Sequence, residues 1–329
     1  MKDSPKSMIL GTGSAVSGKV LTNFDLEKMV DTTDEWIRER SGIERRYILE
    51  KDKTNSDLAM LAGQRALDDA GISADELDVI IVGTVTGDSR FPSTACRVQA
   101  KLGAENAAAF DIAAACSGFI YGLTLADDFI RHCPDKKILV IGSEVLSRIT
   151  DWEDRATCVL FGDGAGAAVI GSSDGKKGIL STYVKSDGRL DYLLHMSGEG
   201  STHPTTHETV DERLHYIRMA GREVFKHAVR TMADAAAHAL KAAGTHAKDI
   251  DLLFAHQANI RIINAIGKRM KLPKDKVFVN IQEYGNTSAA SIPIALDQAR
   301  REGRLKDGHK ALLVAFGAGF TWGSCLVQF

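Results

Sequence analysis

Apolar residues recur along this chain in two patterns. Short apolar runs, such as residues 77–82 and 138–141, predict buried strands. Longer segments, such as 56–70 before Gly71 and 224–243, carry apolar residues at helical spacing and end at or near a glycine. Strands that alternate with helices predict an α/β fold of mostly parallel sheets covered by helices.

The same rules predict the other elements, with Ser56 as the N-cap of the helix that ends before Gly71. A glycine cluster at 162–166 is expected to form a tight turn between two strands. The other expected strands are 8–10, 107–113, 158–161, 167–170, 251–255, 277–280, 310–315 and 323–329, and the other expected helices are 23–40, 95–102, 259–270 and 288–301.

A long internal repeat divides the chain. Residues 74–79 (ADELDV) resemble 247–252 (AKDIDL), and residues 137–140 (KILV) resemble 310–313 (KALL). Both pairs are separated by 173 residues, which predicts a duplicated α/β unit. The turn-rich segment GSSDGKK lies between the copies, so we expect two half-domains, 1–173 and 174–329.

Composition excludes several classes of protein. The chain is 44% hydrophobic and 26% charged, as is typical of a globular protein, and its net charge of −2 gives no reason to expect nucleic-acid binding. No apolar run is long enough to cross a bilayer, and the N-terminal stretch lacks a signal-type apolar region, so a cytoplasmic location without membrane contact is expected. The five scattered cysteines argue against a disulfide framework or a zinc site.

Cys116 is the first candidate for chemistry, because it lies where the small apolar strand 107–113 passes into a helix. The N-terminus of a helix favours the thiolate, which is the nucleophilic form of cysteine. The alternative is a buried structural cysteine. His256 ends one expected strand and Asn286 follows another, and sites in α/β folds form beyond the carboxyl ends of strands.

A cysteine with two neutral donors suits thioester chemistry. The thiol can accept an acyl group, while the histidine and asparagine can stabilise an oxyanion or enolate on a second thioester. Each residue also has an ordinary alternative, since a single histidine at a strand end is often structural and Asn286 beside Gly285 is typical of a turn.

Four longer motifs, in order along the chain, resemble one family. They are DIAAACSGF at 111–119, HQAN at 256–259, GNTSAAS at 285–291 and FGAGFTWG at 316–323, with TTDEWI at 32–37 and GDGAGA at 162–167 also present. Together they are similar to β-ketoacyl-acyl carrier protein synthase III. The resemblance implies a thiolase-like fold of two duplicated α/β halves in an α-β-α-β-α layering, a homodimer, and no cofactor, with acyl-CoA as a substrate.

The resemblance also implies a reaction. Cys116 would take an acyl group, usually acetyl, from acyl-CoA, and malonyl-acyl carrier protein (malonyl-ACP) would lose CO₂ and attack it to give 3-ketoacyl-ACP, initiating fatty-acid synthesis. His256 and Asn286 would stabilise the enolate. The backbone N–H groups of Cys116 and Ala318 would form the oxyanion hole during acylation. Many family members carry glycine at position 318, and the extra methyl leaves the acceptable acyl length open.

Other positions take roles from the same resemblance or from helical spacing. Residues 261, 265, 268 and 269 share a helix face that could meet an acidic carrier protein, or could simply be a solvated surface. The implied CoA contacts are Trp36, Arg40, Arg155 and Asn259, the implied acyl-pocket residues are Phe91 (reaching into the partner subunit) and Phe316, and the candidate carrier-protein contacts are Lys226, Arg261, Lys268 and Arg269.

Rival interpretations have specific weaknesses. The segment 13–20 resembles a P-loop, but Val20 stands where a magnesium-binding hydroxyl is required. The cluster at 162–166 leads into a strand, whereas a dinucleotide loop leads into a helix. His203 and His207 are separated by Pro204, which argues against a metal site. A thiolase reaction, a non-enzymatic binding module and a condensing enzyme with another primer remain alternatives.

Overall fold

The structure is a computed structural model that describes residues 6–16 and 18–329. The first residues of the expected N-terminal half-domain and Ser17 of the P-loop-like segment lie outside this description. Within the described residues, no helix is long and apolar enough to cross a membrane.

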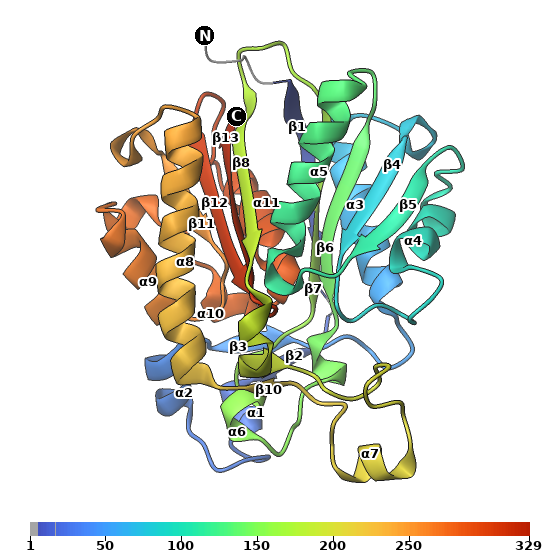
Figure 1. The fold of residues 1–329 in the computed structure, drawn as a ribbon, viewed down its shortest axis with the longest axis vertical. Coiled ribbons are helices and arrows are strands. Elements are labelled where there is room, and N and C mark those ends of the chain that lie inside the picture. The colour runs from blue at the N-terminus through green and yellow to red at the C-terminus, as the bar shows by residue number, and fades with distance from the viewer. Residues whose placement is uncertain (1–5, 17) are drawn as a thin grey trace.

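Two sheets and three layers of helices build the molecule (Figure 1). The first sheet has the order β1-β7-β6-β4-β5 and the second has the order β11-β12-β13-β8. The first sheet comprises β1 (Ser7–Ala15), β4 (Val79–Gly83), β5 (Ala108–Ile112), β6 (Ile138–Glu144) and β7 (Gly164–Ser172), and the second comprises β8 (Gly178–Ser186), β11 (Leu252–Ala255), β12 (Lys310–Gly317) and β13 (Thr321–Gln328).

The repeat predicted from the sequence is present in the strand register. β4 and β6 run parallel with Val79 opposite Ile138, and β11 and β12 run parallel with Leu252 opposite Ala311. Each member of the second pair lies 173 residues after its counterpart in the first. The predicted duplication of an α/β unit is therefore confirmed. The position 173 falls between β7 and β8, and the division into two half-domains there stays a prediction.

Two helices form the central layer between the sheets. α5 (Gly118–His132) packs on β6 and β4 of the first sheet and on β8 and β13 of the second. α11 (Ser291–Arg301) packs on β7 and β1 and also on β11. Outside the sheets, α3 (Asn55–Ala70) and α4 (Thr94–Leu102) cover the first sheet, and α8 (Gly221–Ala242) and α9 (Ile260–Arg269) cover the second (Figure 1).

Shorter elements gather beyond the carboxyl ends of the parallel strands, at the bottom of Figure 1. They include α2, whose N-cap is Thr33 and which carries Trp36. The set consists of β2 (Val20–Thr22), α1 (Asn23–Leu26), α2 (Asp34–Ser41), β3 (Arg45–Tyr47), α6 (Arg155–Cys158), β9 (Leu194–His195), α7 (His207–Asp211), β10 (Arg218–Met219) and α10 (Ile281–Tyr284).

Two helix predictions and one strand prediction need correction. The expected helix 23–40 is two helices, because the Thr33 hydroxyl accepts the N–H of Trp36 and starts α2 afresh. The N-cap of helix α3 is Thr54, which forms a capping box with Asp57. Ser56, the predicted N-cap, lies inside the helix. The expected strand 158–161 is the end of α6 and a loop that makes one bridge, from Phe161 to Asn286.

Two further strand predictions and one turn prediction also need correction. Strand 107–113 was expected to be buried, but β5 is only partly buried because it is an edge strand that pairs with β4 alone. The glycine cluster is not a turn, since it begins β7, where a Cβ on Gly166 would lie 2.6 Å from the backbone nitrogen of Ile294 in α11. The expected strand 277–280 is reduced to a single bridge between Leu253 and Val277.

Candidate active site

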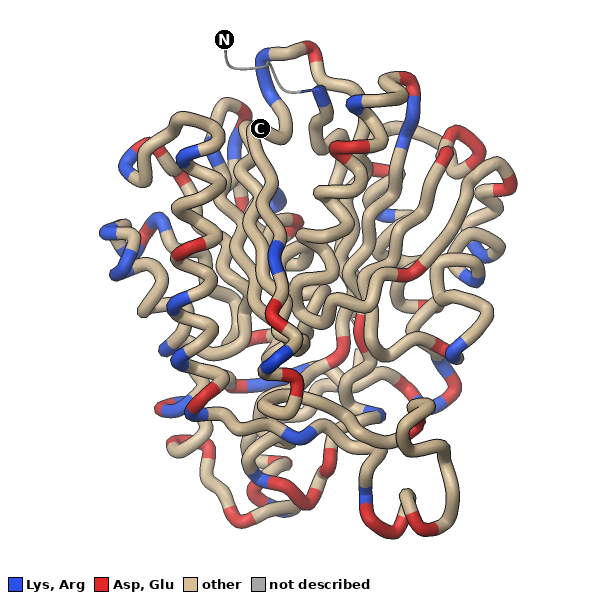
Figure 2. The backbone as a smooth tube through the Cα atoms, viewed as in Figure 1, with Lys and Arg blue, Asp and Glu red and all other residues tan. Residues whose placement is uncertain are grey.

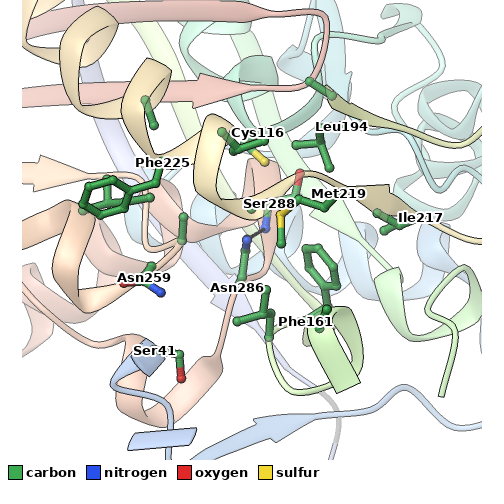
Figure 3. Close-up of a pocket in the computed structure, with 18 of the residues that line it drawn as sticks. Ser41, Cys116, Phe161, Leu194, Ile217, Met219, Phe225, Asn259, Asn286 and Ser288 are labelled. Carbon is green, nitrogen blue, oxygen red and sulfur yellow. Dashed lines mark hydrogen bonds between the residues drawn. The ribbon is translucent and has the colours of Figure 1, made fainter. Parts of the chain in front are cut away.

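A pocket of about 1110 Å³ opens beyond the carboxyl ends of the parallel strands and contains most of the candidate residues (Figure 3). Cys116, His256 and Asn286, which come from three distant parts of the chain, all line it. The other predicted site residues that line it are Trp36, Arg40, Arg155, Lys226, Asn259, Arg261, Phe316 and Ala318. Phe91, Lys268 and Arg269 do not.

Cys116 lies in a one-turn 3₁₀ helix that leads directly into α5, as the sequence predicted. The turn after β12 holds it from the other side, because a Cβ on Gly317 would lie 2.7 Å from the Cys116 backbone nitrogen. Thr321 fastens the two segments: its hydroxyl lies 2.8 Å from the carbonyl oxygen of Ala114 and 3.2 Å from that of Ala318. The backbones of Cys116 and Ala318 therefore lie side by side at the pocket.

The expectation of a thiolate at Cys116 is not met in the unliganded site. Burial raises the pKa of the Cys116 thiol to about 12, against the lowering effect of a hydrogen bond with Ser288. Desolvation thus outweighs the favourable position at a helix start. The resting residue is a thiol, and it must lose its proton as it attacks.

His256 follows β11 and is almost completely buried. Burial lowers its pKa to about 3, so the imidazole is neutral at physiological pH. Its Nδ1 lies 2.6 Å from the hydroxyl oxygen of Ser291, the first residue of α11. When that serine donates, Nε2 carries the proton and is available as a neutral hydrogen-bond donor.

Asn286 is held by both its backbone and its side chain. Its N–H donates to the carbonyl of Leu160 at 2.8 Å, and its carbonyl accepts the N–H of Gly162 at 3.0 Å. The side-chain Oδ1 accepts the backbone N–H of Ser288 at 2.9 Å (Figure 3). Because the oxygen is occupied, the amide NH₂ is the free end, and Asn286 is oriented to donate.

The internal repeat is also visible in the two turns that carry Ala115 and Ser288 at the site. Ala115 and Ser288 are separated by 173 residues, and both have positive φ, 45° and 48°. Non-glycine residues seldom adopt this left-handed conformation, and it concentrates at functional sites. Each residue opens a 3₁₀ turn that leads into a central helix, so the two halves present equivalent turns to each other at the pocket.

The mouth of the pocket is formed by one indole and two guanidinium groups. The guanidinium carbons of Arg40 and Arg155 each lie 4.8 Å from the centre of the Trp36 ring. Arg155 also donates to the carbonyl of Asp31 at 2.7 Å. An indole and planar cations are the groups on which a flat heteroaromatic ring stacks, and at 4.8 Å a guanidinium must move away from the indole before a ring can enter between them.

Comparison with known proteins decides the family. Residues 110–188 match the family described as 3-oxoacyl-[acyl-carrier-protein (ACP)] synthase III, and residues 240–329 match its C-terminal region. The chain is 56% identical to the β-ketoacyl-[acyl-carrier-protein] synthase III of Caldanaerobacter subterraneus over 97% of both chains, and 52% identical to that of Aquifex aeolicus over 98% and 99%. The chain belongs to the β-ketoacyl-[acyl-carrier-protein] synthase III family.

Solved structures agree with the family assignment. A crystal structure of a synthase III from Aquifex aeolicus has a TM-score of 0.92 and 51% identity, covering 98% of this chain and all of its own. The priming β-ketosynthase of the R1128 polyketide pathway has a TM-score of 0.92 at 34% identity. The chain is thus a condensing enzyme of the acyltransferase class that acts in fatty-acid synthesis, and the expected fold class is confirmed.

Three of the predicted synthase III positions lie away from the pocket. Phe91 precedes α4 and is 85% exposed, so its predicted role in a partner's acyl pocket stays a prediction. Lys268 and Arg269 occupy the last turn of α9 and are exposed to solvent. Asn259 lines the pocket but caps α9, accepting the N–H of Arg261 and donating to the carbonyl of Arg40, both at 2.8 Å.

Three polar residues near the nucleophile were missed from the sequence. Ser288 and Ser291 lie within the GNTSAAS motif, one helical turn apart, but nothing in the motif indicates that they contact Cys116 and His256. Glu144 ends β6 and is fully buried behind Ser288. Its place at the carboxyl end of a parallel strand was the signal that could have found it.

No group of three or more metal-ligating side chains is found within residues 6–16 and 18–329. His203, which was weighed as a metal ligand, instead places its Nδ1 3.2 Å from the carbonyl of Ser197. His207 begins the short helix α7 beyond it.

Proposed function

We propose that this enzyme condenses an acyl-CoA primer, acetyl-CoA by preference, with malonyl-ACP to give 3-ketoacyl-ACP through an acyl-Cys116 intermediate. The observation that carries the proposal is the meeting of a thiol, a neutral imidazole and an oriented amide in one pocket. No cofactor is needed, because acyl-CoA supplies the activated acyl group.

Acylation begins with acyl-CoA at the pocket mouth. The adenine ring inserts at Trp36, beside the guanidinium groups of Arg40 and Arg155, and the pantetheine arm passes Asn259 toward Cys116. The thiol attacks the thioester carbon and CoA leaves. Adjacent backbone N–H groups of Cys116 and Ala318 hold the developing oxyanion.

Condensation uses the two neutral donors. The malonyl thioester carbonyl accepts hydrogen bonds from His256 Nε2 and the Asn286 amide, which stabilise the enolate left by loss of CO₂. The enolate carbon attacks the carbonyl carbon of the acyl-cysteine, and the Phe316 ring lines this part of the pocket. A neutral imidazole suits this role, because it donates a hydrogen bond without a proton transfer of its own.

A different primer is the second candidate function. The priming β-ketosynthase of the R1128 polyketide pathway matches all of this chain at 34% identity. Cys116, His256 and Asn286 would act identically on a longer or branched primer. The methyl group of Ala318 borders the pocket and can limit the acyl chain, so the acyl length must be measured.

Intact-protein mass spectrometry after incubation with acetyl-, butyryl-, isobutyryl- and octanoyl-CoA tests both candidates. A single acetyl-sized mass increase is expected. Adducts from longer or branched donors alone would preserve the covalent mechanism and replace acetyl-CoA as the primer. The absence of an adduct from every donor would contradict the proposed function.

A homodimer follows from the same proposal. The edge strand β5 is paired on one side only in the described chain, and the side chain of Phe91, which precedes α4, is 85% exposed. A second copy that covered this edge would bury both features and bring Phe91 to the partner's acyl pocket.

Carrier protein is proposed to dock over α8 and α9, where basic residues recur (Figure 2). Lys226 and Arg261 border the pocket, and Lys268 and Arg269 extend the basic surface beyond it. No ion pair is found for the last three within the described chain, whereas Lys226 pairs with Glu223 at 2.9 Å. Unpaired cations are available to an acidic partner.

Charge reversal at Lys268 tests this surface without touching the pocket. Lys268→Glu is expected to raise the KM for malonyl-ACP about fivefold to tenfold at low salt and to weaken its salt dependence, because one attractive charge becomes repulsive. The KM for acyl-CoA should not change. Lys241→Glu, at the far end of α8, is the matched control. Equal malonyl-ACP kinetics in both variants would reject the docking surface.

A further inference from the structure

Glu144 is a buried carboxylate that the proposed chemistry leaves without a role. Its side chain is completely inaccessible to solvent, yet no Lys, Arg or His is placed to pair with it among the described residues. One carboxylate oxygen accepts hydrogen bonds from the Thr84 hydroxyl and the Val85 N–H, both at 3.2 Å, and from the Thr86 hydroxyl. An unpaired buried acid is costly, so a function is needed to explain it.

The other carboxylate oxygen leads to the nucleophile. It accepts the Ser288 hydroxyl at 3.0 Å, and Ser288 also acts on the nucleophile, because it lowers the pKa of the Cys116 thiol against the larger raising effect of burial. Ser288 lines the pocket beside Cys116 (Figure 3), whereas Glu144 is not among the residues that line it. A hydroxyl can accept one proton while it donates another, so Cys116, Ser288 and Glu144 form a continuous path for a proton.

His256 is poorly suited to take the proton from Cys116. Its burial lowers the imidazole pKa to about 3, and its Nδ1 is already bonded to Ser291. Burial raises the pKa of Glu144 to about 7, where a group can both accept and return a proton near neutral pH. Cys116 is the titratable group that faces Glu144, since the other side chains bonded to it are Thr84, Thr86 and Ser288.

We propose that Glu144, acting through the Ser288 hydroxyl, takes the proton from Cys116 during acylation and returns it after condensation. As the sulfur bonds to the acyl carbon, its proton passes to Ser288 and the serine proton passes to Glu144. The bond to the CoA sulfur breaks, and the CoA thiolate is protonated by solvent. When the enolate later displaces Cys116 as a thiolate, the same path runs in reverse and restores the thiol.

This scheme balances the whole reaction. Condensation of an acyl-CoA with a malonyl thioester carboxylate releases CO₂ and consumes one proton, which is the proton that solvent gives to CoA. Glu144 is therefore unchanged after each cycle. The inference rests on the proposed acyl-Cys116 chemistry. In it, Glu144 is a positioning residue that acts on the Cys116 proton through Ser288.

Glu144→Gln and Ser288→Ala test the relay. Glutamine keeps an oxygen for Thr84, Val85 and Thr86, while its NH₂ donates to the Ser288 oxygen, so the group stays hydrogen-bonded but can no longer accept a proton. Alanine already adopts the same left-handed conformation at the equivalent position, Ala115, and the Ser288 N–H that orients Asn286 is retained. Both variants should fold.

The measurements are single-turnover acylation by acetyl-CoA between pH 5.5 and 9, and decarboxylation of malonyl-ACP, with the melting temperature as a folding check. Wild-type acylation is expected to rise with pH through about 7, because the carboxylate form is the proton acceptor. Both variants should acylate about a hundredfold more slowly at pH 7.5, and their acylation rate should no longer rise with pH through about 7. Their rate of malonyl-ACP decarboxylation should stay within about threefold of the wild-type rate.

Two results would overturn the relay. One is acylation by Glu144→Gln at the wild-type rate and with the wild-type dependence of that rate on pH. The other is an equal loss of acylation and decarboxylation, which would mean that Glu144 only supports the fold of the site. Failure of wild-type protein to acylate at all would instead contradict the proposed function, so the two failures are distinguishable.

Discussion

Cys116→Ser is expected to lower the rate of acyl-enzyme formation by at least about a thousandfold, because a serine hydroxyl is a far weaker nucleophile than a thiol in the same place. The substitution is small, and the surrounding backbone contacts from Gly317 and Thr321 do not involve the sulfur. Loss of the acyl adduct should therefore report chemistry and not misfolding. Mass spectrometry with the preferred acyl-CoA measures it directly.

Cys96→Ser provides the matched control. Cys96 is exposed on α4, outside the pocket, and its loss should leave the adduct and the turnover intact. Cys325 is buried in β13, away from the pocket, and a structural role accounts for it. An acyl adduct of undiminished yield on Cys116→Ser would show that another group is the nucleophile and would end the covalent assignment to Cys116.

The architecture of the site was predictable to the extent that it follows from strand ends and the repeat. Cys116 and His256 lie just beyond the ends of strands that the sequence pattern located. The 173-residue repeat places the turns of Ala115 and Ser288 opposite one another, whereas the strand expected before Asn286 is only a single bridge. These relations depend on backbone topology, which apolar periodicity and turn residues largely determine.

The failures share a different cause, which is competition between local signals and tertiary contacts. Residues 277–280 have the composition of a strand, but the Gln257 side chain replaces the neighbouring strand: it donates to the Phe278 carbonyl at 3.3 Å and accepts the Asn280 N–H at 3.0 Å. The helix start at Cys116 favours a thiolate, but burial by both halves reverses the balance. Neither effect is visible before the halves are packed together.

Glu144 illustrates the same limit at the level of function. Its hydrogen bond to Ser288 spans 144 residues and crosses from the first sheet to the turn before the second central helix. No local pattern connects the two positions. The sequence motif around Ser288 was recognisable, but its partner could be found only from the packed structure.

His256→Ala is expected to slow decarboxylation of malonyl-ACP by about 10²–10³-fold while leaving acylation of Cys116 within about tenfold of wild type. The imidazole supplies one of two neutral donors to the enolate, and it is not the proton acceptor for the thiol. Because the imidazole is neutral above a pKa of about 3, wild-type decarboxylation should not fall between pH 8 and pH 5 through titration of His256. Separate assays of the two half-reactions, each followed against pH, measure this.

Ser291→Ala is a milder test of the same role of His256. It removes the hydroxyl bonded to His256 Nδ1 but keeps the imidazole, so decarboxylation should fall by about tenfold and acylation should not change. An equal loss of both half-reactions in His256→Ala would contradict its assignment to the enolate. Glu144→Gln is expected to give the opposite pattern, with acylation impaired and decarboxylation retained. The two buried groups have different serine partners, Ser291 for His256 and Ser288 for Glu144, and that separation is the physical reason their effects should divide between the two steps.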